Sequence, residues 1–284
     1  MRRIGFIFLL VIAGIIVVWG ARDLGRKRET YPVSKSEEKQ TEQVEEKKKI
    51  EKEAEILFKK AEEYFQKGQW KEAGASYKKI LADWPESPIA RKAEERLGEV
   101  NLKLLFSPSY TEGSKIYEVK SGDSLFSIAK KFGVTVDLIK RSNALESDSI
   151  YPGQRLKIPT LKFSILIDKS DNTLILEGDG KMIKKYSVST GKNNSTPVGE
   201  FKIVSKLVNP VWYYQGKAIP PGDSRNVLGS RWLGLSIKGC GIHGTTDPDT
   251  VGKQITRGCI RMLNKDVEEL YAIVPIGTRV VIQD

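Results

Sequence analysis

An uninterrupted apolar run near the N-terminus constrains this chain most, because such a segment at a chain end fits a membrane better than a globular core. Residues 4–20 carry no charged side chain and follow Arg2 and Arg3. A run of about 17 residues is near the shortest that spans a bilayer as a helix. We expect residues 1–21 to be an uncleaved anchor, with a signal peptide cleaved near Ala21 as the alternative. Either outcome takes the later domains out of the cytoplasm.

The next segment is dense in charge and poor in large apolar side chains. Residues 22–49 are rich in Lys, Glu, Gln and Ser, and cannot bury enough apolar surface to form a core. We expect a flexible or partly helical linker. The net charge of the chain, +11, suits anionic lipid or an acidic cell wall, although a merely solvated basic surface stays open. Because no nucleic-acid-binding motif accompanies this charge, a nucleic-acid partner is not expected.

Residues 50–106 change to a helical period. Leu57, Ala61 and Tyr64 recur on one face, and similar stripes follow on either side of Pro85. Seven positions resemble one tetratricopeptide unit: Ala61, Tyr64, Gly68, Trp70, Ala73, Tyr77 and Pro85. A lone unit leaves an apolar face uncovered. A protein-binding hairpin and a plain helical spacer therefore both remain open.

Residues 115–160 have the pattern of a small βααβ module. An alternating strand leads to a Gly122-Asp123 turn, and Asp123 or Ser124 is placed to cap a helix. Thr135 is placed to cap a second helix, and residues 155–159 form the return strand. These motifs closely resemble a LysM module, which binds N-acetylglucosamine-containing glycans. The resemblance implies a shallow sugar groove between residues 122–126 and residues 143–152. Its glycan-binding candidates are Gly122, Asp123, Ser124, Leu125 and Asn143.

Residues 162–284 contain short strand-like runs separated by turn residues. One late helix is expected from Lys265 to about Ile273, with Asn264 as its cap. Short strands at this frequency, with one helix, indicate a mainly β domain of sandwich or barrel type. The chain as a whole is expected to be multidomain, with a membrane or signal helix, an α-helical hairpin region, a βααβ module and a mainly β domain.

The last domain holds the only histidine, His243, and both cysteines, Cys240 and Cys259. A thiol becomes a strong nucleophile when a neighbouring base favours its thiolate, so a Cys–His catalytic pair is one interpretation. A zinc site that adds Asp247 or Asp249 to these three residues is a second. A disulfide between the two cysteines is a third.

The stretch around this pair resembles the signature of L,D-transpeptidase (YkuD-type) catalytic domains. That signature is His-Gly, a spacer, then Ser/Thr-x-Gly-Cys-hydrophobic-Arg/Asn, and Thr196-Pro197-Val198-Gly199 is a further family motif. The resemblance implies that Cys259 attacks a peptide carbonyl, that His243 takes the thiol proton, and that the Gly244 carbonyl fixes the His tautomer.

The resemblance also places residues at the oxyanion and at the substrate. These are Thr256, Arg257, Gly258 and Arg261. The N–H groups of Gly258 and Cys259 would bind the oxyanion. Arg257 stands where many members carry a second His, which favours a structural role. Arg261 would bind a substrate carboxylate, with a salt bridge to Asp266 or Glu268 as the alternative.

Together the two resemblances imply an L,D-transpeptidase that cross-links peptidoglycan, or attaches proteins to it, through a cysteinyl thioester. Its expected partners are glycan strands and stem peptides, the membrane through residues 1–21, and a protein partner for the helical region. No metal or cofactor is implied. The expected location is the cell envelope, on the outer side of the cytoplasmic membrane. An L,D-carboxypeptidase and a non-catalytic wall-binding scaffold remain the alternatives.

Overall fold

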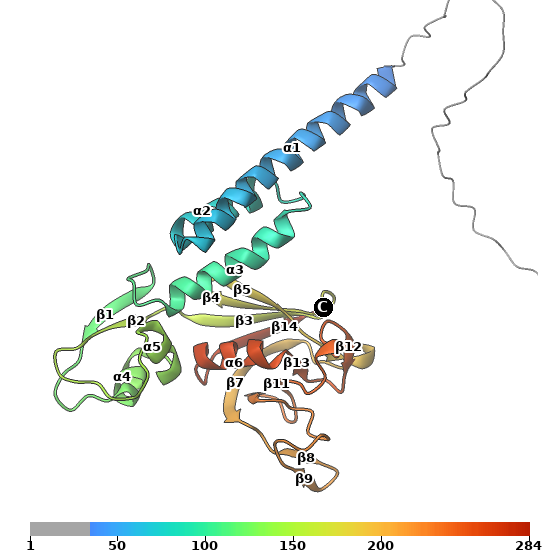
Figure 1. The fold of residues 1–284 in the computed structure, drawn as a ribbon. Helices are drawn as coiled ribbons and strands as arrows, with labels where there is room; N and C mark the ends of the chain where they lie inside the picture. The colour runs from blue at the N-terminus through green and yellow to red at the C-terminus, as the bar shows by residue number, and fades with distance from the viewer. Residues whose placement is uncertain (1–34) are drawn as a thin grey trace, which may run out of the picture. The chain divides into compact units, whose positions relative to one another are not determined.

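The computed structural model describes residues 35–284 (Figure 1). The chain divides into two compact units, residues 1–45 and 46–284, and the features below lie in the second unit except for the start of the first helix. The expected membrane segment, residues 1–21, lies outside the described residues. Within residues 35–284, none of the helices combines the length and the apolar character needed to cross a bilayer.

Three α-helices come first: α1 (Lys35–Gln66), α2 (Trp70–Asp83) and α3 (Ala90–Phe106). The helical period expected from residue 50 onward is confirmed. Its buried side chains form one apolar cluster of Ala61, Ala73, Tyr77, Ile80, Ala93, Leu97 and Val100. The first helix already begins at Lys35, within the segment expected to be a flexible or partly helical linker. That segment is rich in Lys, Glu and Gln, which have high helix propensity.

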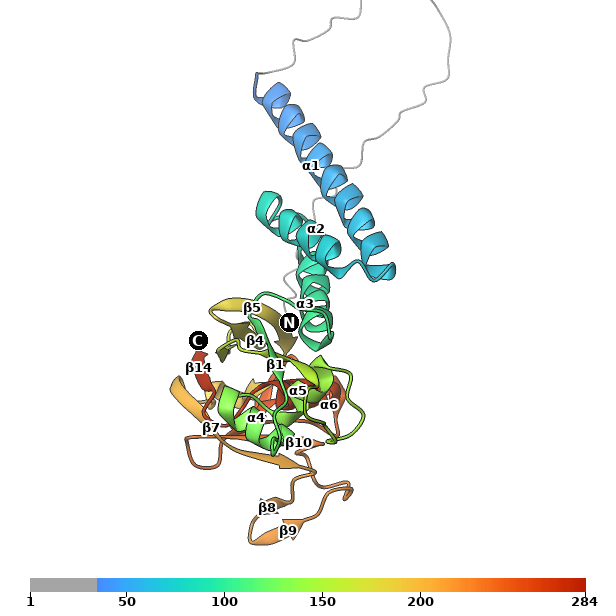
Figure 2. The same ribbon diagram turned by 90° about the vertical axis from the view of Figure 1, so that its left-hand side faces the viewer.

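Helix α3 packs on strand β5 (Lys181–Ser187) of the C-terminal domain, as two views show (Figures 1 and 2). The Asn101 side-chain amide donates to the Ile183 carbonyl at 2.9 Å. At Gly98 an added Cβ would lie 3.0 Å from Lys184 Cγ, so helix and strand approach closely there. The sequence pattern predicts both elements, but not this contact between them.

The expected βααβ order is confirmed for the small module. Its elements are β1 (Ser114–Glu118), α4 (Leu125–Phe132), α5 (Val136–Ser142) and β2 (Arg155–Pro159). The two strands pair antiparallel. Ser124 caps α4 through reciprocal bonds with Ser127, and the Thr135 hydroxyl caps α5.

A buried lysine connects this module to α3. Lys157 on β2 is 2% exposed, and its ammonium donates to the carbonyl oxygens of Leu104 and Ser107 at 2.8 and 2.9 Å. These acceptors lie in the last turn of α3 and just after it, where a helix leaves its carbonyls unpaired and favours a cation. Burial nevertheless lowers the pKa of Lys157 to about 8.

The C-terminal domain is built on one eight-stranded mixed sheet. In sheet order its strands are β13 (Ile260–Arg261), β11 (Gly241–His243), β10 (Arg231–Leu235), β7 (Gly199–Val208), β14 (Arg279–Gln283), β3 (Phe163–Asp168), β4 (Thr173–Gly178) and β5. The mainly β character is confirmed. The last strand pairs parallel with β3 and antiparallel with the first half of β7, while the second half of β7 pairs with β10, so this long strand connects the two halves of the sheet.

Short elements complete the domain outside this sheet. They are the ribbon of β6 (Thr190–Gly191) with β12 (Gln254–Thr256), the hairpin of β8 (Trp212–Tyr214) with β9 (Lys217–Ile219), the 3₁₀ turns η1 (Lys192–Asn194) and η2 (Pro248–Thr250), and helix α6 (Asn264–Ile273). The helix contacts β10 and β11, near the edge of the sheet that holds His243.

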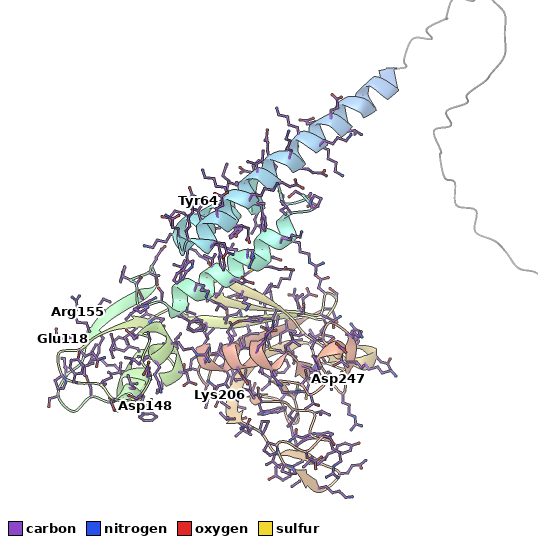
Figure 3. The ribbon with its side chains drawn as sticks, in the orientation of Figure 1. Tyr64, Glu118, Asp148, Arg155, Lys206 and Asp247 are labelled. Atoms are coloured by element: carbon purple, nitrogen blue, oxygen red, sulfur yellow. The ribbon has the colours of Figure 1, made fainter. Side chains whose placement is uncertain are left out.

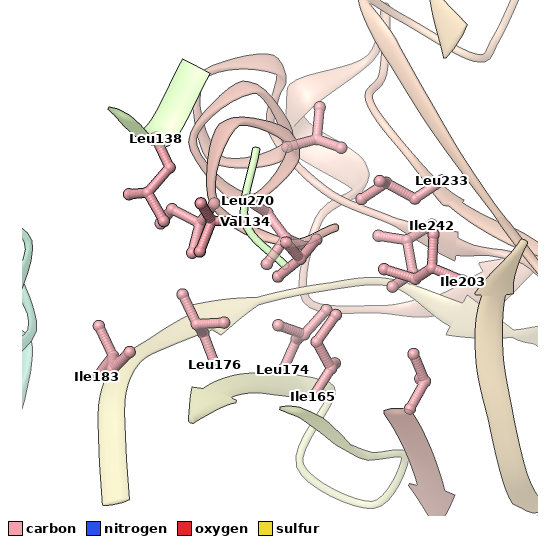
Figure 4. Packing of buried hydrophobic residues seen from close by; sticks show 14 of the residues in the cluster. Val134, Leu138, Ile165, Leu174, Leu176, Ile183, Ile203, Leu233, Ile242 and Leu270 are labelled. Atoms are coloured by element: carbon pink, nitrogen blue, oxygen red, sulfur yellow. The ribbon is translucent and has the colours of Figure 1, made fainter. Parts of the chain in front are cut away.

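The sheet, α6 and the βααβ module share one hydrophobic core. Leu270 of α6 lies over Leu174 and Leu176 of β4, and Val134 and Leu138 of the module pack into the same cluster (Figure 4). This continuity fixes the module against the C-terminal domain through apolar burial, the main favourable term in folding.

The C-terminal end of α6 is held by polar contacts from two sides. The Thr135 hydroxyl donates to the Ala272 carbonyl. Lys206 of β7 donates to the carbonyl oxygens of Tyr271 and Val274 at 2.6 and 2.8 Å (Figure 3). Burial lowers the pKa of Lys206 to about 8. The helix that leads away from the active-site edge is thereby fixed in position.

Candidate active site

His243 and Cys259 lie together at one edge of the sheet. Strands β11 and β13 run parallel, with Ile242 opposite Ile260 and His243 opposite Arg261. Cys259 directly precedes β13, so its side chain begins beside the start of β11, near Gly241. The Cys259 thiol lies close enough to the His243 ring for the ring to lower the pKa of the thiol. The loop between the two strands thus returns the thiol to the only histidine of the chain.

A main-chain carbonyl orients the histidine. Nδ1 of His243 lies 2.7 Å from the carbonyl oxygen of Gly244. Because a carbonyl only accepts, Nδ1 carries the proton in the neutral ring and Nε2 is left to face Cys259. His243 is buried, whereas Cys259 is half-buried. The thiol is therefore the more accessible member of the pair.

The pKa of the Cys259 thiol is lowered well below its ordinary value. The largest cause is a hydrogen bond from Cys240, and the hydrogen bond and charge of His243 and the N–H of Gly241 act in the same direction. Burial opposes them. A lowered pKa increases the fraction of reactive thiolate at neutral pH.

Trp232 forms a wall beside the pair. Its ring stacks on His243, with centroids 5.9 Å apart and planes 18° apart. Leu207, Trp232 and His243 are cross-strand neighbours on β7, β10 and β11, so they face the same side of the sheet. A Cβ on Gly241 would lie 2.6 Å from a Trp232 ring atom, so the indole fits only over glycine. The sequence pattern gives Trp232 no role, because this contact depends on the register of three strands.

Asn264 braces the loop that carries Gly244. Its carboxamide oxygen accepts from the N–H groups of Ser230 and Thr245 at 3.1 Å each, and its amide donates to the Thr245 carbonyl at 2.9 Å. A Cβ on Gly244 would lie 2.1 Å from that oxygen. The prediction that Asn264 caps α6 is wrong, because Leu263 occupies the cap position and the Asn264 side chain turns to the loop.

Thr256 and Gly258 set the shape of the loop before Cys259. Gly258 has φ +122°, which glycine adopts readily. The Thr256 hydroxyl donates to the Cys259 carbonyl at 2.6 Å and accepts from the Gly258 N–H at 3.2 Å. One of the two expected oxyanion donors therefore has a long bond within the loop, which it must exchange to bind a substrate oxygen.

Arg257 is exposed and lies against the β8–β9 hairpin. Its guanidinium is 4.6 Å from the centroid of the Tyr214 ring. That ring stacks in turn on Trp212 at 4.7 Å. Arg257 thus joins the Cys259 loop to the hairpin, an arrangement compatible with the structural role expected from the sequence.

Arg261 points along the same edge from β13. Its Nη1 donates to the Thr250 hydroxyl at 2.9 Å, while its buried Nε finds no acceptor among residues 35–284. The alternative ion pairs with Asp266 or Glu268 are not formed within the described residues, and Glu268 pairs with Arg231 instead. A buried donor without a partner costs free energy, so Arg261 is suited to an incoming acceptor.

The second cysteine lies next to the first without bonding to it covalently. Both Cys240 and Cys259 are free thiols, so the disulfide interpretation is wrong for this structure. For zinc, residues 35–284 contain no group of three or more His, Cys, Asp or Glu side chains arranged to hold a metal ion.

The expected glycan-binding residues of the βααβ module largely have structural contacts. Gly122 turns the chain at φ +86°, Leu125 is 2% exposed, and Ser124 caps α4. Asp123 accepts from the Tyr117 hydroxyl, and the Asn143 amide group bonds to main-chain groups of neighbouring elements. Two aromatic side chains in the same two segments are instead exposed: Phe126, in the first turn of α4, at 72%, and Tyr151, in the loop before β2, at 66%.

Family models match two segments of the chain. Residues 162–282 match the L,D-transpeptidase catalytic domain (YkuD), and residues 117–159 match the LysM domain. The matched segments correspond to the mainly β domain and to the βααβ module.

Two curated relatives come from Bacillus subtilis. The chain is 37% identical over 173 residues to the putative L,D-transpeptidase YkuD, which covers 58% of this chain and 97% of that protein. It is 44% identical over 126 residues to the putative L,D-transpeptidase YqjB, and this match covers 42% of this chain and 70% of that protein. Among solved structures, L,D-transpeptidase 3 from Mycobacterium tuberculosis aligns with TM-score 0.39 and 18% identity, covering 46% of this chain and 66% of that one.

Proposed function

Because this chain belongs to the YkuD family of L,D-transpeptidases, we propose that it cross-links peptidoglycan, or attaches proteins to it, by acyl transfer through Cys259. The observation that carries the proposal is that the Gly244 carbonyl orients the His243 ring, and that the pairing of β11 with β13 brings this ring beside the Cys259 thiol. Nucleophile and base are then present within the chain, and neither a metal nor a cofactor is needed for this reaction.

In the first half-reaction, Cys259 attacks the carbonyl carbon between the third and fourth residues of a stem tetrapeptide. The thiol proton passes to Nε2 of His243, and a negative charge develops on the substrate oxygen. When the tetrahedral intermediate collapses, the C–N bond breaks and His243 returns the proton to the leaving amine. D-Alanine departs, and a thioester remains on Cys259.

In the second half-reaction, an amine on a neighbouring stem peptide attacks the thioester. His243 takes a proton from this amine and gives it to the departing sulfur, which restores the thiol. Water in place of the amine would give hydrolysis and hence an L,D-carboxypeptidase. The half-exposed position of Cys259 admits a second substrate after the first product leaves.

The developing oxyanion is proposed to bind the N–H groups of Gly258 and Cys259. The long 3.2 Å bond from Gly258 to Thr256 is readily exchanged for a charged acceptor. Removing one such donor typically costs about 10²–10³ in kcat. Arg261, with its unpartnered Nε, is proposed to hold a substrate carboxylate.

The remaining parts of the chain are proposed to place the enzyme in the cell envelope. The LysM domain, residues 117–159, would hold it on wall glycan. Residues 1–21 would attach it to the outer side of the cytoplasmic membrane. The helical region, residues 50–106, would serve as a spacer or bind a partner protein, and its likeness to a tetratricopeptide unit stays a prediction.

Mass analysis of muropeptides after incubation with the purified protein tests this function. We expect loss of D-alanine and the appearance of cross-linked dimers. Cys259→Ala and His243→Ala should each remove nearly all turnover, and the double variant should be no worse, because nucleophile and base act as one unit.

Other product patterns would decide against the proposal. Trimmed monomers without dimers would identify a carboxypeptidase. If a folded protein left the muropeptides unchanged, the result would favour the alternative of a non-catalytic wall-binding scaffold. Full activity of Cys259→Ala would contradict the assignment of the nucleophile.

A further inference from the structure

The proposed acyl transfer gives no role to Cys240, although this thiol lies against the nucleophile. Cys240 Sγ is 3.4 Å from the Gly258 carbonyl oxygen, and Cys259 Sγ is 3.4 Å from the Gly239 carbonyl oxygen. Each sulfur therefore reaches the carbonyl of the residue that precedes the other cysteine. This reciprocal crossing places the sulfur atoms side by side, so each thiol acts on the pKa of the other.

The sheet holds this arrangement in place. Ile242 pairs with Ile260, so the residues just before each strand, which include both cysteines, lie next to one another. Cys240 is only 7% exposed, whereas Cys259 is half-buried. Substrate thus meets Cys259 first, and Cys240 supports it from the buried side.

We propose that Cys240 is a positioning residue for the acyl transfer, because its S–H donates a hydrogen bond to the Cys259 thiolate and holds that sulfur beside His243. The inference rests on the proposed function and adds a residue to the same site. A thiol is a weak donor to a neutral acceptor but a better one to an anion, and the effect is larger where water is excluded.

The proton stays on Cys240 for electrostatic reasons. The hydrogen bond and charge of Cys259, together with burial, hold the pKa of Cys240 well above its usual range. Ionising both thiols would put two negative charges in contact. Besides Cys240, the groups that act on Cys259 are the His243 ring and the Gly241 N–H. Cys240 is therefore the donor of the pair and Cys259 the acceptor.

The proton balance of the reaction is unchanged by this contact. With Cys259 neutral, the Cys240 hydrogen is directed to the Gly258 carbonyl. When Cys259 passes its proton to His243, the Cys240 hydrogen turns to the thiolate without leaving its own sulfur. Once the thiolate has attacked and the C–S bond has formed, the Cys259 sulfur is neutral and the hydrogen returns to the carbonyl.

The resting contact also orients an oxyanion donor. The Gly258 carbonyl and the Cys259 N–H belong to one planar peptide unit and point in opposite directions. Because Cys240 holds the carbonyl on the buried side, the N–H of Cys259 is turned away from it. The same side chain thus acts on the nucleophile and on a donor proposed for the transition state.

The pH dependence of Cys259 alkylation by iodoacetamide, followed by peptide mass spectrometry on the purified protein, tests this inference. In Cys240→Ala we expect the midpoint to move up by about one pH unit or more, and the rate below both midpoints to fall about tenfold. The acid limb of kcat/KM should move equally. Cys240→Ser, whose hydroxyl can donate, should restore the low midpoint.

Cys240→Val, a second variant without a donor, serves if Cys240→Ala does not fold, and circular dichroism checks both. Equal midpoints in the wild type and in a folded variant without the donor would overturn the inference, as would failure of Cys240→Ser to restore the shift. Alkylation needs no turnover, so a shifted midpoint without cross-linking would leave this inference standing while the proposed function fails.

Discussion

At the scale of single residues, the active site depends on how one main-chain carbonyl is held. The Gly244 oxygen sets the tautomer of His243, and Asn264 holds the loop that carries it through three hydrogen bonds. No side-chain carboxylate occupies this role. A main-chain acceptor orients the histidine well only while its loop is rigid. Asn264, which lies outside the catalytic pair, supplies this rigidity.

Asn264→Ala is therefore expected to reduce kcat without unfolding the protein. Loss of the three bonds lets the Gly244 carbonyl move, and a misplacement of about 1 Å costs up to about 10²-fold in rate. Steady-state kinetics of cross-linking measures the effect. Asn194→Ala, which removes an exposed amide bonded to Asp284, is the matched control and should retain the wild-type rate. Equal kcat in the two variants would contradict the role of Asn264 in positioning the Gly244 carbonyl.

The sequence identifies His243 and Cys259 because their residue types occur so rarely in this chain and stand in a recognisable motif. It does not identify Trp232 or Asn264 as part of the site. Trp232 reaches His243 only through the register of β10 on β11, and Asn264 reaches Ser230 and Thr245 only after α6 docks on the sheet. Both contacts are set by tertiary packing and leave no local pattern.

At the scale of elements, two lysines, one buried and one half-buried, cap the C-terminal ends of helices. Lys157 of β2 donates to the end of α3, and Lys206 of β7 donates to the end of α6. A cation at a helix C-terminus is favoured by the helix dipole, whereas its burial is costly. Each strand therefore fixes a helix in a way that depends on the charge of one side chain.

Stability should consequently depend on pH through Lys157. Its folded pKa, about 8, is lower than that of an ordinary lysine, so the unfolded chain holds more protons between pH 8 and about 10.5. Its contribution to the free energy of unfolding should rise across this window, by an amount on the order of 1–3 kcal/mol. Lys157→Met should lack this rise and should lose stability at every pH, because the carbonyls of α3 lose their donor.

Hydrogen exchange in β1 and β2 at several pH values measures this effect. Lys115→Met, which changes an exposed lysine on the neighbouring strand, is the control and should follow the wild type. A constant difference between the wild type and Lys157→Met from pH 7 to about pH 10.5 would contradict the lowered pKa.

Local patterns predict most elements but not how they join. The helical period and the βααβ order follow from spacing and caps, which act within a few residues, and the late helix is predicted although its expected cap, Asn264, is not its cap. The continuous sheet does not, because it requires β14, the last strand, to insert between β3 and β7. Helix α1 begins at Lys35, and its residues 44–49 are exposed, so helix propensity rather than burial supports this part of the helix.

At the scale of the whole molecule, residues 46–284 behave as one compact unit. The core that contains Leu270 of α6 also contains Leu138 of the LysM domain and Leu105 of α3. Isolated fragments would expose parts of this core. Wall binding is therefore better tested with surface variants of the complete chain than with its separate domains.

Phe126→Ser with Tyr151→Ser is expected to weaken binding to insoluble peptidoglycan about tenfold or more, because exposed aromatic rings supply contact area for sugars. Co-sedimentation measures this binding. The control is Tyr110→Ser, which changes an aromatic ring that is 61% exposed and lies outside the LysM domain. The fold and the reactivity of Cys259 should be unchanged in all variants. Equal retention of the double variant and the control would place the glycan surface elsewhere.

The contact of Thr135 with Ala272 and the shared core have a geometric consequence for the product. With the glycan held by the LysM domain as proposed, the span from the bound sugar to Cys259 is constant. Stem peptides project from a glycan strand at regular intervals, so a constant span selects donors by their position along the strand. Cross-links would then occur at regular intervals along the glycan strand, and the distance from the bound sugar to Cys259 would set the interval.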